Sequence, residues 1–201
     1  MSELMTFMHL GFRHITDLAA LDHILFLLAL AAIYRGRDWR DTLWVVSAFT
    51  IGHSITLALA VTGALRLPTA LIEFLIPVTI VVTGVENILV RRRDEAPLRG
   101  RYRPVFAAAF GLVHGAGFAN YLRSLFTGSI AVPLLGFNVG IELGQLVVLA
   151  IAGLGLAALD RVLGWVRAPE ATPSVLRLRT LAVSALVVTV AAEMAVARRP
   201  W

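Results

Sequence analysis

Long apolar runs dominate this sequence and limit what the chain can fold into. Six of them stand out, at residues 15–34, 42–64, 70–90, 104–124, 132–159 and 176–197. A helix of about 20 residues crosses the roughly 30 Å of hydrocarbon in a bilayer. Isolated strands would leave their backbone polar groups unpaired in lipid. The sequence therefore predicts an all-α fold, a polytopic membrane helix bundle of about six transmembrane helices.

The composition agrees with this prediction. The chain is 58% hydrophobic and only 15% charged, whereas a soluble domain is about half apolar and a quarter charged. No polar stretch is long enough to fold alone, so we expect residues 1–201 to form a single integral membrane domain. The absence of cysteine excludes disulfides, thiolate metal sites and cysteine nucleophiles. Residues 1–12 lack the pattern of a removable signal peptide, so the first span is expected to insert by itself.

The arginines predict how the chain is oriented. All 18 basic residues are arginine, and 13 of them lie in the segments 35–40, 91–103 and 161–179, which connect apolar runs. Because loops rich in arginine stay in the cytoplasm, both termini are expected on the periplasmic or extracellular side. The same placement beside apolar runs indicates a lipid bilayer as partner and no nucleic acid.

Ionisable residues inside the predicted spans are the strongest functional signal. Such groups are costly in lipid and are candidates for function. His23, His53 and His114 fall at a similar depth in three spans, Glu142 reaches that depth in a fourth, and Asp22 adjoins His23. Imidazoles and carboxylates together form a ligand set for a divalent transition metal. The sequence thus predicts a metal site at mid-membrane made of these five residues.

Other polar residues suggest a path to and from that site. His14 and Asp17 lie near the expected outer end of the first span and are assigned to an entrance. A solvated or packing role explains His14 more simply than a ligand role. Glu86 lies near the expected inner end of the third span. It is interpreted either as an exit residue or as the ion-pair partner of a loop arginine such as Arg91.

One face of the fifth expected span is polar. Asn138, Glu142 and Gln145 follow i, i+4, i+7 spacing and therefore share a helix face. None of these side chains can face lipid cheaply, so the stripe is expected to point into the bundle. We assign Asn138 and Gln145 to positions behind the metal ligands, which they would orient.

The same polar residues lie in a series of motifs along the chain, at 14–15 (HI), 21–28 (LDHILFLL), 49–57 (FTIGHSITL), 85–87 (VEN), 110–119 (FGLVHGAGFA) and 137–145 (FNVGIELGQ). In these motifs the sequence resembles the HupE/UreJ family of bacterial membrane proteins, in particular its second branch, over about residues 9–150. The better-known branch has proline after its first histidine, where this chain has Ile15, and Ala-Met where this chain has Phe26 and Leu27.

The resemblance implies a six-helix protein of the bacterial inner membrane that handles nickel or cobalt. It also implies that metal binds at the Asp-His and His-Ser motifs, that is, around Asp22–His23 and His53–Ser54. The departures from the better-known branch leave the identity of the metal open among nickel, cobalt and zinc.

Three functional hypotheses follow. The first is a permease or metal acceptor for a divalent ion, which binds the ion at mid-membrane. The second is an intramembrane zinc hydrolase acting on a lipid or membrane peptide, with Asp22 or Glu142 as general base and Ser54 or Asn138 stabilising the oxyanion. The third is a structural polar core or a partner-binding subunit without metal. We favour the first over an enzyme, and leave open whether the chain forms an oligomer.

Overall fold

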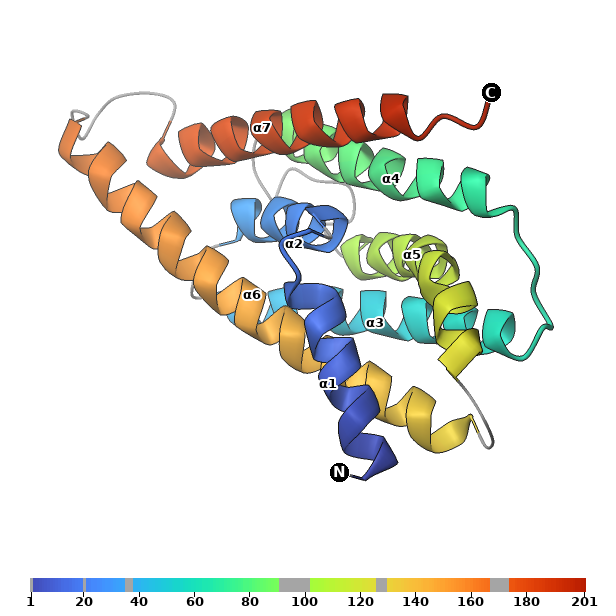
Figure 1. Cartoon of the computed structure of the whole chain (residues 1–201). Helices are drawn as coiled ribbons and strands as arrows, with labels where there is room; N and C mark the ends of the chain where they lie inside the picture. The colour runs from blue at the N-terminus through green and yellow to red at the C-terminus, as the bar shows by residue number, and fades with distance from the viewer. Residues whose placement is uncertain (1, 20, 35–37, 91–101, 126–129, 167–173) are drawn as a thin grey trace.

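The computed structural model describes residues 2–19, 21–34, 38–90, 102–125, 130–166 and 174–201. These residues form helices and no strands, which confirms the all-α prediction. The seven helices are α1 (Glu3–Thr16), α2 (Leu21–Ile33), α3 (Trp39–Val61), α4 (Thr69–Leu89), α5 (Arg103–Leu125), α6 (Ala131–Val166) and α7 (Val175–Ala197). Their order along the chain is shown by the colours of Figure 1.

Helix length and apolarity identify the membrane spans. Among the described residues, α3, α4, α6 and α7 are each long and apolar enough to cross a bilayer, and α1 with α2 would make a fifth span. α5 has 23 residues but is not among these candidates. The chain is therefore a membrane helix bundle, and the predicted number of six spans is approximate.

The first predicted span is not one helix. The sequence predicted a span at 15–34, but α1 begins at Glu3 and the axes of α1 and α2 meet at 68°. Asp17 ends α1 with extended backbone, and its carboxylate accepts a hydrogen bond from the backbone N–H of Ala19 at 2.9 Å, as aspartate does in turns. With 13 residues, α2 is about 20 Å long and cannot cross the hydrocarbon alone. The break therefore lies inside the bundle.

Glycines hold two pairs of helices in backbone contact. A Cβ atom at Gly140 of α6 would overlap the carbonyl oxygen of Met8 in α1. In the same way, a Cβ atom at Gly115 of α5 would overlap the carbonyl oxygen of His53 in α3. Small residues allow this close approach, which favours association through van der Waals contact because lipid is as apolar as the helix surface.

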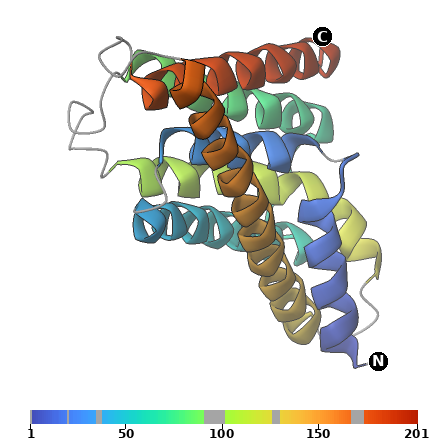
Figure 2. The same cartoon turned by 90° about the vertical axis from the view of Figure 1, so that its left-hand side faces the viewer.

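The remaining helices enclose these pairs. In Figure 1, α4 and α7 lie side by side along the upper edge, α3 lies below, and α2 and α5 lie between them. The second view shows the same layers, with α1 alongside the first half of α6 (Figure 2). The second half of α6 exposes large apolar side chains such as Leu154 (74%), as a lipid-facing helix does.

Arginine side chains cap the C-terminal ends of α4 and α2. Arg177 donates hydrogen bonds to the carbonyl oxygens of Asn87 and Val90 at the end of α4, each at 3.0 Å. Arg179 donates to the carbonyl oxygen of Tyr34, just after α2, at 2.7 Å. A cation at a helix C-terminus satisfies carbonyls that lack intrahelical partners and complements the helix dipole.

Other arginines used to predict the orientation fall outside the described residues, namely Arg35, Arg37, Arg91, Arg92, Arg93, Arg99, Arg101 and Arg167.

The glycine contacts give a test of the fold. Replacing Gly140 by alanine is expected to destabilise the protein by about 1–3 kcal/mol, because the added methyl group must push α1 away from α6. Gly153→Ala on the same helix is the matched control, since a Cβ atom there meets nothing described within 4 Å. Thermal unfolding in detergent measures both variants, and equal midpoints would contradict the packing described.

Candidate metal centre

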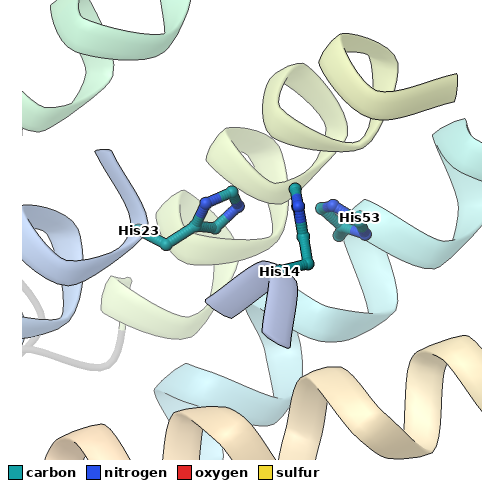
Figure 3. Close-up of side chains that lie close together, drawn as sticks. All are labelled: His14, His23 and His53. Atoms are coloured by element: carbon teal, nitrogen blue, oxygen red, sulfur yellow. The ribbon is translucent and has the colours of Figure 1, made fainter. Parts of the chain in front are cut away.

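Three histidines meet at the break in the first span. His14 lies in the last turn of α1, His23 is the third residue of α2, and His53 lies in the middle of α3. Because the chain bends between α1 and α2, two residues nine positions apart come together instead of lying on separate turns of one helix. Figure 3 shows the three rings pointing toward one another from their three helices.

The distances fit one small cation. Each ring offers one nitrogen, and these nitrogens lie within 4.8 Å of one another. The ring centroids are 4.6 Å apart for His14 and His23, and 6.3 Å apart for His23 and His53. Around one ion with metal–nitrogen bonds of about 2.0–2.1 Å, ligand nitrogens lie about 3–3.5 Å apart. Rotations of the rings that bring the nitrogens up to about 1.5 Å closer would complete that geometry.

The ring nitrogens are buried and have no hydrogen-bond partner in the part of the chain described. This holds for Nε2 of His14, Nε2 of His23 and both nitrogens of His53. Leaving a buried polar atom unpaired costs about 1–3 kcal/mol. Three such atoms from separate helices at one point are not explained by packing, whereas a bound metal ion would satisfy them together.

His114 of α5 lies beside this trio. Its Nε2 is 3.0 Å from the hydroxyl oxygen of Thr79, and that hydroxyl donates its own hydrogen to the carbonyl of Ile76 at 2.7 Å. Nε2 must therefore carry the hydrogen and donate it, which leaves Nδ1 with a free lone pair. Nδ1 has no partner among the described residues, and the ring centroid is 5.4 Å from that of His23. Metal-binding histidines are commonly oriented in this way.

Asp22 supplies the carboxylate nearest the histidines. Its Oδ1 accepts a hydrogen bond from the backbone N–H of His23 at 3.1 Å and lies 3.3 Å from His23 Nδ1. Its Oδ2 lies 3.3 Å from the guanidinium of Arg198, which follows α7. Nothing in the sequence pairs Arg198 with Asp22, because the two residues are 176 positions apart. The negative charge at the site is therefore shared with an arginine.

A cleft of about 670 Å³ opens onto His14, His23 and His114. It lies toward the end of the bundle where α4 begins and α5 and α7 end, since it is lined by Glu73, Tyr121 and Arg198. The remaining charged and imidazole side chains of its wall are Arg13, Asp17, Asp22, His14, His23 and His114.

The polar stripe of α6 serves a different contact. The carboxylate of Glu142 accepts a hydrogen bond from Ser47 of α3 at 2.7 Å, and Gln145 accepts one from Thr50 at 2.8 Å. The Oδ1 atom of Asn138 is buried without a hydrogen bond to any described residue. Glu142 is thus engaged in joining α6 to α3 and is not part of the histidine trio.

Glu86 is held at the opposite end of the bundle. Its carboxylate accepts hydrogen bonds from the Arg103 guanidinium at 2.6 Å and from the Tyr102 hydroxyl. Burial, together with the hydrogen bond and charge of Glu86, raises the pKa of Tyr102 to about 12, so this phenol stays protonated and donates. Arg91, which the sequence suggests as an ion-pair partner of Glu86, lies outside the described residues.

From the sequence, His14 is predicted to lie at an entrance, whereas the structure places His14 beside His23 and His53. The difference comes from the broken span. A continuous helix over 15–34 would put His14 far above His23, but the bend after Asp17 brings the two rings together. The available signal was Asp17 within an apolar run, because aspartate favours turns over helix interiors.

These features define a class: a membrane helix bundle with a histidine cluster where its first span is broken. The model of one protein family, described as HupE / UreJ protein, matches residues 1–197. The chain therefore belongs to the HupE/UreJ family, which is generally related to nickel and cobalt transport. No curated protein and no solved structure matches it.

The site predicts which histidines bind metal. His14→Ala is expected to weaken nickel binding by at least about tenfold, because it removes one ligand of the trio. His9→Ala is the matched control on the same helix, since His9 is exposed, and its effect is expected to stay within about twofold. Calorimetric titration in detergent measures both, and equal affinities would place the metal elsewhere.

Proposed function

We propose that this protein binds a divalent transition metal ion at His14, His23 and His53 and carries it across the bacterial cytoplasmic membrane. The observation that carries the proposal is the convergence of three imidazole nitrogens within 4.8 Å. Imidazole suits nickel, zinc, copper and iron. Membership of a family related to nickel and cobalt transport makes Ni²⁺ or Co²⁺ the proposed substrate, with Zn²⁺ as the competing ion.

The charge around the site supports transport rather than permanent storage. A transported ion must be held strongly enough to enter but weakly enough to leave. The trio consists of imidazoles, which are neutral when they bind metal, and the adjacent Asp22 carboxylate is also paired with Arg198. This ligand set carries less negative charge than a group of free carboxylates, so a moderate affinity is expected.

The distribution of the arginines indicates which side of the membrane the cleft faces. Arg103, Arg177 and Arg179 lie where α5 and α7 begin, at the end of the bundle opposite the cleft. Arginine-rich ends face the cytoplasm. In the proposed orientation both termini lie outside the cytoplasm, and the cleft admits ions from the periplasmic or extracellular side.

The alternative function, an intramembrane zinc hydrolase, is favoured by one observation. Three histidines with a carboxylate nearby are the ligand and base set of many zinc enzymes. However, the Ser54 hydroxyl donates to the carbonyl of Thr50 at 2.6 Å, and Glu142 accepts from Ser47 at 2.7 Å. Of the residues considered for catalysis, Asp22 alone lines the cleft. We therefore favour metal transport over zinc-dependent hydrolysis.

Uptake by the purified protein tests the proposal. Proteoliposomes containing the wild-type chain are expected to accumulate Ni²⁺ or Co²⁺, and His53→Ala to lower the rate by at least about tenfold through loss of a ligand. His9→Ala serves again as the control that removes an exposed imidazole. Uptake unchanged in His53→Ala would contradict the proposal. Purified protein that binds no metal would instead favour a structural polar core.

A further inference from the structure

A second, smaller cavity lies beyond the histidines. It has a volume of about 80 Å³ and is lined by Thr83 and Glu86 from the last turns of α4 and by Tyr102, Arg103 and Phe106 at the start of α5. The cleft described above lies toward the other ends of the same two helices. The two cavities therefore lie toward opposite ends of the bundle, and histidines line only the cleft.

Aromatic rings separate the two cavities. Phe26 is 1% exposed and lines the small cavity, while its ring centroid lies 5.7 Å from that of His114, which lines the cleft. Phe49 packs against Phe26 with centroids 4.7 Å apart, and Phe110 lies 6.4 Å from it. One layer of side chains centred on Phe26 thus blocks passage from the histidines to Glu86.

A line of polar groups on α4 passes this layer. The Thr79 hydroxyl contacts His114, and the Thr83 hydroxyl donates to the carbonyl of Thr79 at 2.9 Å. Thr79, Thr83 and Glu86 follow i, i+4, i+7 spacing, so they share one face and span about 10 Å along the helix. Both threonines are buried, at 7% exposed each. The face of α4 therefore offers oxygen atoms from the histidine site to Glu86.

Arg103 occupies the end of this line. Its guanidinium lies 2.6 Å from both carboxylate oxygens of Glu86 and 3.3 Å from Oδ1 of Asn87. The side chain is 5% exposed, and its Nε is buried without a partner among the described residues. A positive group thus already sits among the three oxygen atoms, at a place that attracts cations.

We propose that Glu86, Asn87 and Thr83 form a second cation station, which the metal ion reaches from the histidines past Phe26 when Arg103 moves aside. This inference rests on the proposed transport function and gives it an exit. Oxygen ligands hold nickel and cobalt less tightly than imidazole, so an ion at this station is closer to release. The structure is then the state open at the cleft and closed at Glu86.

Transport and binding together test the station. Glu86→Gln keeps the shape of the side chain but removes its charge, so uptake into proteoliposomes is expected to fall by at least about tenfold while nickel affinity stays within about twofold. Glu193→Gln, at an exposed glutamate of α7, is the matched control and should leave both unchanged. Uptake by Glu86→Gln at the wild-type rate would overturn the proposal.

Thiol labelling tests the path without relying on transport, because the chain has no cysteine of its own. Thr83→Cys is expected to react slowly with a small charged thiol reagent added on the cleft side. Adding Phe26→Ala should accelerate that reaction by at least about tenfold, since truncating a buried phenylalanine opens a cavity. Equal rates would show that no path runs past Phe26 and would overturn the inference.

The two experiments also separate the proposals. If the wild-type chain takes up no metal, the transport function fails, and labelling still decides whether the path exists. If Glu86→Gln loses nickel binding as well as uptake, the variant is misfolded, and the labelling result decides in its place.

Discussion

The backbone contact made at glycines is the interaction on which the candidate site depends. His14 follows Gly11 by one helical turn, and Gly11 packs on the carbonyl of Phe137 in α6. His53 is next to Gly52, which packs on α5. In lipid such helix pairs gain no hydrophobic driving force from association, so close packing must supply it. Side chains as short as histidine can meet from different helices only because these backbones are held at fixed positions.

Polar contacts join the two glycine-packed pairs. Ser47 and Thr50 of α3 donate hydrogen bonds to Glu142 and Gln145 of α6, so the α1–α6 pair is fastened to the α3–α5 pair. An unpaired polar group is expensive in hydrocarbon, which gives these few bonds strong directional control. The polar stripe of α6, which the sequence assigns to the metal site, thus contributes to that site indirectly. It holds α6 against α3 and so helps to position His14 and His53.

The sequence predicted the helical membrane fold, because apolar runs of about 20 residues have no other stable state in lipid. It also predicted that histidines would share one depth, since depth follows from position along a helix. The sequence does not specify how each helix is rotated about its own axis. It therefore could not distinguish Glu142, which accepts a hydrogen bond from Ser47, from residues that face the histidine trio. Nor did it show the bend after Asp17, where local turn chemistry outweighs a continuous apolar pattern and brings His14 to His23.

X-ray absorption spectroscopy of the purified protein carrying one equivalent of Ni²⁺ is the most direct test of the convergence of these rings. Imidazole ligands give metal–nitrogen distances near roughly 2.1 Å and a characteristic multiple-scattering pattern from the outer atoms of the ring. The account predicts the signature of at least three histidines, from His14, His23 and His53. A spectrum with oxygen ligands alone, or with a single imidazole, would contradict it.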